Sequence, residues 1–346
     1  MKIGNFEIGK DNKVFIIAEL SANHNQNFDL ALESIKTIKE CGADAIKLQT
    51  YTADTLTIDS DKEYFKIQQG TVWDGTTLYH LYQKAYTPWA WQPKLKAYAE
   101  ELGLECFSSP FDKSAVDFLE KMNVPAYKIA SFEIVDIPLI EYVASKGKPV
   151  IISTGIATEE EIGEAVNACL KFGNDQIALL KCTSEYPAPI EDANLKTIPA
   201  LAKKFNTVVG LSDHSLGTIV STAAIALGAQ IIEKHFILDR KIGGPDSAFS
   251  LEPAEFKKMI DDIRMVEKAL GKESFELTDK IKRSRKFARS LFVVKDIKAG
   301  EIFTEENVRS IRPSHGMSPK SINEILGKKA TKNIERGTPL SWDLVE

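Results

Sequence analysis

The sequence predicts an α/β fold, a closed (β/α)8 or TIM barrel followed by a small C-terminal domain. Eight short apolar runs alternate with amphipathic segments between residues 14 and 236. These runs are apolar almost throughout, which is typical of parallel strands that helices cover on both faces. The pattern changes after residue 272, where a polar and basic stretch precedes a shorter, internally repeated unit.

The predicted strands are, in chain order, VFIIAE (14–19), DAIKLQT (44–50), LECFSS (104–109), AYKIAS (126–131), PVIIST (149–154), IALLKCT (177–183), TVVGLSD (207–213) and QIIEKHF (230–236). The segments FDLALESIKTIKECG and EEEIGEAVNACLKFG are typical of the connecting helices, and Asn27 and Gly42 are expected to begin and end the first of them. An open doubly wound sheet is the alternative architecture. No GxGxxG motif follows the first strand, which disfavours its dinucleotide-binding form.

A long insertion, residues 51–95, separates the second and third predicted strands. It carries Trp73, Trp89 and Trp91, three of the four tryptophans, together with several tyrosines. One interpretation is an extra helix that packs its aromatic side chains on the barrel rim. The other is a lid or wall over the site, and the two are compatible.

The predicted domains are the barrel (1–275), a linker (276–286) and the small C-terminal domain (287–346). Within the last, KDIKAGEIFTEENV (295–308) repeats as KNIERGTPLSWDLV (332–345). Each copy is expected to form a strand, a glycine turn and a short capped helix, related by a pseudo-twofold axis. A domain this small has little core of its own. We therefore expect it to dock on its own barrel or on that of a partner subunit.

Composition excludes several classes of function. The 346 residues carry 44 Lys and Arg against 49 Asp and Glu, so the net charge of −5 gives no basic surplus for nucleic acid. No apolar run is long enough to span a bilayer, and the N-terminus lacks the apolar core of a secretory signal. The scattered cysteines are expected to be buried free thiols in a reducing cytoplasm; they are Cys41, Cys106, Cys169 and Cys182.

Polar residues occupy the carboxyl ends of nearly all predicted strands, where (β/α)8 barrels form their sites. A polar, anion-tolerant active site is therefore expected at this end. The residues are Glu19, Lys47, Gln49, Ser109, Lys128, Ser131, Ser153, Thr154, Lys181, Thr183, Asp213, His214, Glu233 and His235.

Two histidines end neighbouring strands, His214 the seventh and His235 the eighth. Glu233 shares a face with His235, because residues two apart on a strand point the same way. Two imidazoles with Glu233 and Asp213 nearby suit a borderline divalent ion such as Mn²⁺, Zn²⁺ or Co²⁺. The alternative is a pair of hydrogen-bonded core histidines with Asp213 capping a loop. Lys234 is expected to face the other way and to form at most an ion pair.

Lys47 and Lys128 lie inside otherwise apolar strands, and a buried lysine must meet an anion or lose its charge. With the hydroxyls of Ser109, Ser131 and Ser153, the two amines fit a compact dianion that carries phosphate and carboxylate. A Schiff-base lysine is one alternative. A structural ion pair to Glu19 or Glu133 is the other.

Sequence blocks around these residues resemble the sialic acid synthases. The blocks are FIIAELSANHN, AIKLQTY, CFSSPFD, AYKIAS, IISTGIAT, LLKCTSEYPAP, GLSDHS, IEKHF and GPD, in order over essentially the whole chain. The tail segments FARSLFVVKDIKAGEI and RSIRPSHG resemble the family's antifreeze-like (SAF) domain. Within the family, AYTPWAW and KLQTYTADTLT most resemble the pseudaminate-forming branch.

The resemblance implies an enzyme that condenses phosphoenolpyruvate with a 2-acetamido aldose, in that branch 2,4-diacetamido-2,4,6-trideoxy-L-altrose. C3 of the enol attacks the open-chain aldehyde, C2 takes water, and phosphate leaves with cleavage of its C–O bond. An N-acetylneuraminate or legionaminate synthase is the alternative within the family. A carbohydrate-binding protein with an inactive barrel is the alternative from another class.

The resemblance also implies roles for residues. His214 and His235 would bind a divalent ion, Mn²⁺ before Mg²⁺ or Co²⁺, and Glu19, Glu233 and His235 would be catalytic. Arg312 would reach into the barrel of a partner in a domain-swapped homodimer. The phosphoenolpyruvate cradle would comprise Lys47, Ser109, Lys128, Ser131 and Ser153, and the sugar contacts Gln49, Tyr186 and Asp246.

One position departs from the family pattern. Sialic acid synthases carry asparagine after the CT of the sixth strand, where this chain has Ser184 in CTSEYP. Because that asparagine contacts substrate, the change weakens an N-acetylneuraminate assignment without establishing the pseudaminate one.

Overall fold

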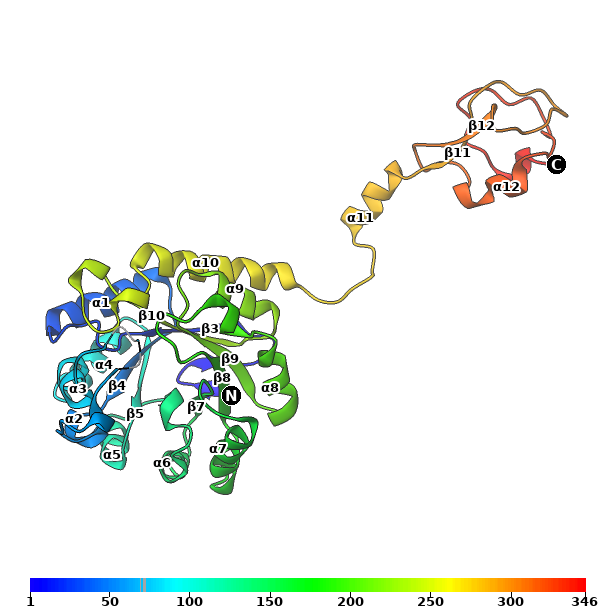
Figure 1. Ribbon diagram of the computed structural model, residues 1–346. Coiled ribbons are helices and arrows are strands. Elements are labelled where there is room, and N and C mark those ends of the chain that lie inside the picture. Colours follow the sequence, from blue (N-terminus) through cyan, green and yellow to red (C-terminus); the bar gives the residue numbers. More distant parts are fainter. Residues whose placement is uncertain (69, 71–72) are drawn as a thin grey trace. The chain divides into compact units, whose positions relative to one another are not determined.

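The computed structural model (Figure 1) describes residues 1–68, 70 and 73–346, and the chain divides into two compact units, residues 1–271 and 272–346. The first unit is a closed barrel of parallel strands in the order β10-β3-β4-β5-β6-β7-β8-β9. Closure of β10 onto β3 rules out the open doubly wound sheet. The barrel strands are β3 (Phe15–Glu19), β4 (Ala45–Thr50), β5 (Glu105–Pro110), β6 (Tyr127–Ile129), β7 (Val150–Ser153), β8 (Ile177–Cys182), β9 (Val208–Asp213) and β10 (Ile231–His235).

Helices follow the strands and cover the outside of the barrel (Figure 1). The predicted boundaries of the first helix are confirmed. The Asn27 side chain accepts hydrogen bonds from the N–H groups of Asp29 and Leu30, and Gly42 ends the helix at a φ of 95°. The covering helices are α1 (Phe28–Cys41), α4 (Gln92–Glu101), α5 (Lys113–Lys121), α6 (Ile137–Ala144), α7 (Glu159–Lys171), α8 (Thr197–Phe205), α9 (Ile219–Ala226) and α10 (Pro253–Leu270).

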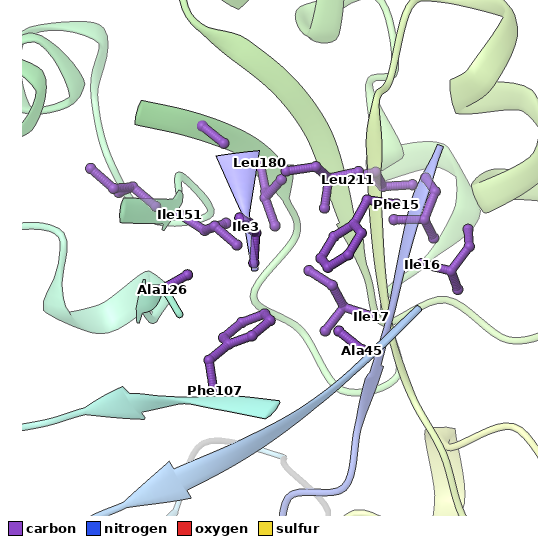
Figure 2. Close-up of a cluster of buried hydrophobic side chains, with 14 of the residues drawn as sticks. Ile3, Phe15, Ile16, Ile17, Ala45, Phe107, Ala126, Ile151, Leu180 and Leu211 are labelled. Carbon is purple, nitrogen blue, oxygen red and sulfur yellow. The ribbon is translucent and has the colours of Figure 1, made fainter. Parts of the chain in front are cut away.

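The N-terminal hairpin, β1 (Lys2–Ile3) and β2 (Phe6–Glu7), lies at the amino end of the barrel. Ile3 is fully buried and sits among Phe107, Leu180 and other interior side chains (Figure 2). Gly4 has a φ of +53°, a left-handed conformation that glycine adopts without strain, and its backbone packs against the carboxyl group of Glu105. Apolar packing thus fills the amino end and leaves polar chemistry to the carboxyl end.

The insertion after β4 forms α2 (Ala53–Leu56), the 3₁₀ turn η1 (Glu63–Phe65) and α3 (Leu78–Ala85); residues 69, 71 and 72 within it lie outside the described residues. The Trp89 indole donates to the Tyr51 carbonyl at 3.0 Å, as expected of rim packing. The Trp73 indole donates to the Pro245 carbonyl at 2.8 Å, and its ring lies 5.4 Å from that of Tyr186. The insertion therefore packs on the rim and also contributes to the wall of the site.

The C-terminal unit contains α11 (Asp279–Ser284), β11 (Ser290–Val293), β12 (Val308–Ile311) and α12 (Ile322–Ile325). The two repeat copies pair with each other, since Ile297 and Ile334 exchange backbone hydrogen bonds of 2.9 and 2.8 Å. The expected strand–turn–helix copies are only partly right. The expected strands are reduced to isolated bridges, at Ile297 and Ile302 in the first copy and at Ile334 and Pro339 in the second, and only the second copy has a helical turn, the 3₁₀ segment Trp342–Leu344. In the first copy the Asn307 side chain closes the turn instead, bonding Thr304 N and Ile302 O.

Two further predictions concern the whole chain. All four cysteines, each of which the structure describes, are free and buried, as predicted. Among the described residues, no helix combines the length and apolarity needed to cross a membrane.

Candidate active site

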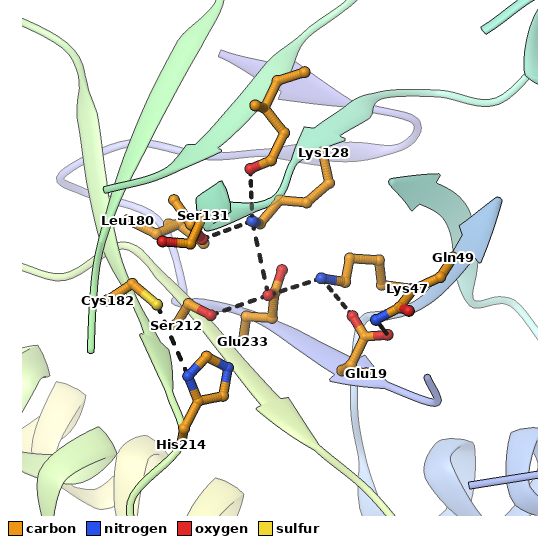
Figure 3. Close-up of polar contacts among 12 residues, drawn as sticks. Glu19, Lys47, Gln49, Lys128, Ser131, Leu180, Cys182, Ser212, His214 and Glu233 are labelled. Atoms are coloured by element: carbon orange, nitrogen blue, oxygen red, sulfur yellow. Dashed lines mark hydrogen bonds and ion pairs between the residues drawn. The ribbon is translucent and has the colours of Figure 1, made fainter. Parts of the chain in front are cut away.

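A buried network of lysines and carboxylates occupies the carboxyl end of the barrel (Figure 3). The Lys47 amine forms an ion pair with Glu19 and donates to Glu233 Oε1 at 2.9 Å. Lys128 Nζ lies 3.9 Å from the same Glu233 oxygen, which also accepts from Ser212 Oγ at 3.1 Å. All five side chains are buried. Mutual pairing stabilises charges that would be unfavourable alone in this interior.

Strand register builds this network. Glu19 of β3 is paired with Lys47 of β4 on one side and with His235 of β10 on the other. The pKa of Lys47 is lowered to about 8, mainly by burial. Lys128 also lowers this pKa, and Glu233 partly offsets both effects by raising it. Burial would raise the pKa of Glu233, but Lys128 and Lys47 outweigh it and hold that pKa below its usual value. Glu233 is therefore ionised at neutral pH.

Hydroxyl groups surround the Lys128 amine. Its Nζ donates to Ser153 Oγ at 2.6 Å and to the Ile129 carbonyl at 3.0 Å. The Ser109 hydroxyl is buried and has no hydrogen-bond partner among the described residues. A buried hydroxyl without a partner is unfavourable unless a ligand completes it. Lysine and hydroxyl donors at this spacing suit a small anion.

Gly155 leaves room for two of these hydroxyls. Ser184 Oγ donates to Ser131 Oγ at 2.7 Å. A Cβ on residue 155 would lie 2.2 Å from Ser184 Oγ and 2.6 Å from Ser131 Oγ. Glycine after β7 is therefore a steric requirement of the hydroxyl cluster.

The rings of His214 and His235 are neighbours, with centroids 5.3 Å apart. His214 Nδ1 lies 2.9 Å from the Thr183 carbonyl, so Nδ1 carries a hydrogen. Burial would lower the pKa of His214, but Cys182, the Thr183 carbonyl and Glu233 outweigh it and raise that pKa above its usual value. His235 Nδ1 is buried without a hydrogen-bond partner in the described part of the chain, and it lies 3.9 Å from Asp246 Oδ2. Burial, with His214 nearby, holds the pKa of His235 well below its usual value, so this imidazole is neutral.

This donor set fits a divalent cation in part. The neutral His235 imidazole can offer a nitrogen lone pair, and an unpaired buried ring nitrogen is better explained by a ligand than by core packing. Within residues 1–68, 70 and 73–346, no group of three or more His, Cys, Asp and Glu side chains could hold a metal. Substrate or water would therefore have to supply the other ligand positions.

The expectation that Asp213 lies beside the histidine rings is wrong. Adjacent residues on a strand point to opposite faces, and Asp213 is turned outward to an ion pair with Lys234 at 2.8 Å. The ion pair expected of Lys234 is confirmed. His24 lies past β3 and makes loop hydrogen bonds to Thr87 Oγ1 and Gln26 N.

Three of the remaining predicted site residues lie in the barrel, and the fourth lies in the C-terminal unit. Gln49 approaches Glu19 at 3.5 Å, and the Tyr186 ring lies 4.4 Å from that of His214. Asp246 is buried near His235. Arg312 follows β12 in the C-terminal unit, where it is exposed.

Glu133 is a candidate residue that the sequence reasoning named only as a potential partner of the lysines. It ends the 3₁₀ turn η2 (Ser131–Glu133) directly after β6. Burial raises the pKa of Glu133 to about 7, against the opposing effect of Lys128. Its Oε2 is buried without a hydrogen-bond partner among the residues described. The only sequence feature that could have indicated a site role for Glu133 is its position two residues after Ser131.

Glu133→Gln should change how stability depends on pH. The folded-state pKa of about 7 exceeds the usual 4.5, so the proton on Glu133 stabilises the fold below about pH 4.5, and this contribution is lost as pH rises through 7. The wild type should lose about 2–3 kcal/mol of unfolding free energy between pH 5 and pH 8 that the glutamine variant keeps. Urea unfolding at both values measures this. Glu160→Gln, at an exposed position, is the control; equal pH profiles for wild type and Glu133→Gln would contradict the prediction.

The fold and the site together define a (β/α)8 barrel with an anion-binding, lysine- and carboxylate-rich centre beside a histidine pair. The NeuB family profile matches residues 34–275, and the SAF domain profile matches residues 288–346. The chain belongs to the NeuB family and ends in a SAF domain.

Individual relatives support this membership over nearly full length. The chain is 53% identical over 340 residues to the pseudaminic acid synthase of Campylobacter jejuni strain 81-176, covering 98% of each chain. It is 50% identical over 332 residues to that of Helicobacter pylori, covering 96% of this chain and 97% of the relative. An N,N'-diacetyllegionaminic acid synthase of Legionella pneumophila is 37% identical over 98% of this chain and 96% of the relative.

A solved structure supports the fold. The N-acetylneuraminic acid synthetase of Leptospira borgpetersenii, in complex with citrate, superposes with a TM-score of 0.74 at 34% identity. The match covers 82% of this chain and 94% of the other.

Proposed function

We propose that this protein is a pseudaminic acid synthase, which condenses phosphoenolpyruvate with 2,4-diacetamido-2,4,6-trideoxy-L-altrose and releases phosphate. The observation that carries the proposal is the 53% identity over 98% of both chains to an enzyme of that name. Identity to the legionaminate enzyme is lower, at 37%, although coverage is equally complete.

Lys47 and Lys128 bind the phosphoenolpyruvate anion, together with the hydroxyls of Ser109, Ser131 and Ser153. The unpaired Ser109 hydroxyl and the short Lys128–Ser153 contact of 2.6 Å support this role. Charge-assisted bonds from a fixed, buried amine hold a phosphate or carboxylate better than mobile surface lysines do.

His214 and His235 hold a divalent cation, for which we propose Mn²⁺, with Mg²⁺ or Co²⁺ as substitutes. When bound, the cation supplies Lewis acidity toward the aldehyde oxygen of the open-chain sugar. Nitrogen donors favour Mn²⁺ or Co²⁺ over Mg²⁺, which prefers oxygen ligands.

Glu19 and Glu233 orient the reactants and move protons as C3 of phosphoenolpyruvate attacks the aldehyde carbon, water adds at C2 and phosphate departs. Glu233 Oε2 is buried without a hydrogen-bond partner among the described residues, so it is available to a substrate proton. Gln49, Tyr186 and Asp246 contact the sugar. The Tyr186 ring lies against His214, which supports a sugar site beside the cation.

The protein works as a domain-swapped homodimer in which Arg312 of one subunit serves the barrel of the other. Exposed apolar side chains on the loops after β6, β7, β8 and β9 support a covered rim; they are Phe132, Val135, Ile156, Ile190, Leu216 and Ile219. Exposed apolar side chains gathered on the loops at one end of a barrel are typical of an interaction surface. We also propose a cytoplasmic location, supported by the four free buried thiols.

A substrate panel tests the proposed function. Phosphate release from phosphoenolpyruvate is measured with the diacetamido altrose, N-acetylmannosamine and the legionaminate precursor, each with and without Mn²⁺. We expect release that needs both sugar and metal, and a kcat/KM at least tenfold higher for the altrose. Preference for either other sugar would replace the proposed substrate, and absence of release with all three would leave the carbohydrate-binding alternative.

A further inference from the structure

Lys234 lies between two residues of the candidate site, Glu233 and His235, yet its side chain points to the outer face of the barrel. It is fully buried. Its Nζ donates to Asp213 Oδ2 at 2.8 Å and to the Ser215 carbonyl at 2.5 Å. These two acceptors flank His214 in the chain. The residue that precedes His235 therefore bonds to the residues on both sides of His214, to the side chain of Asp213 and to the backbone of Ser215.

The Asp213 carboxylate is fully bonded. Oδ1 accepts from Ser215 N at 2.9 Å and from Ser215 Oγ at 2.6 Å, and Oδ2 accepts from Ser221 Oγ at 2.6 Å as well as from Lys234. Ser221 belongs to α9, so the cluster joins β9, β10 and a covering helix. No ligand is needed to complete this ion pair, in contrast to Ser109 and His235.

Strand register explains what the ion pair controls. Lys234 pairs with Asp213 and Glu233 pairs with Ser212 across β10 and β9. A shift of one residue would move Glu233 and His235 from the interior to the outer face. Apolar side chains could join the two strands without the desolvation that an ion pair requires, so stability alone gives little reason for one here. Directional bonds to residues 213 and 215 fix the orientation of His214, which apolar contacts would not.

We propose that Lys234 and Asp213 are positioning residues that hold His214 and His235 at the separation a divalent cation requires. Neither side chain touches the cation or the substrates. The inference rests on the proposed function, because it assigns the pair to the cation site described there. Groups that orient metal ligands change cation affinity by about 10- to 100-fold when they are removed.

The test uses the full-length protein and Co²⁺ as the probe. Asp213→Asn combined with Lys234→Met removes both charges, while the asparagine can still accept from Ser215. We expect a melting temperature close to that of the wild type, Co²⁺ affinity lower by about 10- to 100-fold, and a changed Co²⁺ absorption spectrum. Single Lys234→Met, which leaves Asp213 buried and unpaired, should weaken binding and also lower the melting temperature.

Two further variants keep the test decisive. Arg264→Met with Asp44→Asn removes a partly buried ion pair remote from the histidines and should leave Co²⁺ binding unchanged. Ser221→Ala removes one hydrogen bond to Asp213 without removing a charge, and should weaken Co²⁺ binding severalfold. This variant replaces the double variant in the test if the double variant does not fold.

The outcomes separate the two proposals. Wild-type Co²⁺ affinity and spectrum in the double variant, or in Ser221→Ala if the double variant does not fold, would overturn the positioning role alone. Equal Co²⁺ binding by the wild type and His235→Ala would instead overturn the proposed cation site, and the positioning role with it. Weakened binding in the Asp213 and Lys234 variants but not in the Arg264 and Asp44 variant supports the inference.

Discussion

Replacing His235 with alanine is expected to lower kcat by at least about 10³-fold, even at saturating Mn²⁺. A Lewis acid contributes several kcal/mol of transition-state stabilisation, and each 1.4 kcal/mol corresponds to a factor of about ten in rate. His235 ends β10 with an unpaired buried ring nitrogen, beside His214 at 5.3 Å between ring centroids. His214 alone would leave the cation one protein ligand.

The measurement is phosphate release from phosphoenolpyruvate with the sugar and a Mn²⁺ titration. His80→Ala is the matched control, because His80 is exposed on α3 and should tolerate the change. The melting temperature of His235→Ala should stay within a few degrees of the wild type, since Nδ1 has no hydrogen-bond partner among the described residues and the ring loses mainly its contacts with His214 and Phe249. Near-normal turnover with saturating Mn²⁺ would remove His235 from the proposed ligand set.

The barrel could be predicted because its signals are local and repeated. Each strand is mostly apolar and buried on both faces, and Asn27 and Gly42 define the ends of α1 by their own side-chain and backbone chemistry. Residues at strand ends could also be grouped correctly, since parallel strands bring their carboxyl ends together. Glu19, Lys47, Lys128 and Glu233 therefore lie together at that end, where Lys47 forms the ion pair with Glu19 that was the alternative to an anion cradle.

The contacts that the sequence did not predict depend on loops or on strand faces. Asp213 is the last residue of β9 and points outward to Lys234, whereas the adjacent His214 faces the site, so neighbours in the chain lie on opposite faces. Glu133 is brought in by a 3₁₀ turn beyond the end of β6. The contact between Ser184 and Ser131 requires two loops and the missing side chain of Gly155, which no periodic pattern encodes.

The substitution Lys128→Met is expected to reduce kcat/KM for phosphoenolpyruvate by about 10²- to 10³-fold. Truncating one partner of a buried, hydrogen-bonded charge pair removes about 2–5 kcal/mol of binding. Lys128 Nζ is bonded to Ser153 and Ile129, and it lies 3.9 Å from Glu233 Oε1. The variant loses a cation for the substrate, and the pKa of Glu233 should rise because Lys128 is the leading charge that lowers it.

Steady-state kinetics and chemical trapping together assign the role of the amine. Lys96→Met, on α4 and paired with Glu100 outside the barrel, is the matched control and should leave KM for phosphoenolpyruvate unchanged. If Lys128 binds the anion, the variant raises KM and borohydride with pyruvate labels neither protein. Covalent labelling of the wild type that disappears in Lys128→Met would instead identify an imine-forming lysine, and would contradict the proposed C–O cleavage chemistry. The hydrogen bonds from Lys128 Nζ to Ser153 Oγ and the Ile129 carbonyl favour the first result, because they hold the amine in place as a donor beside the proposed anion site.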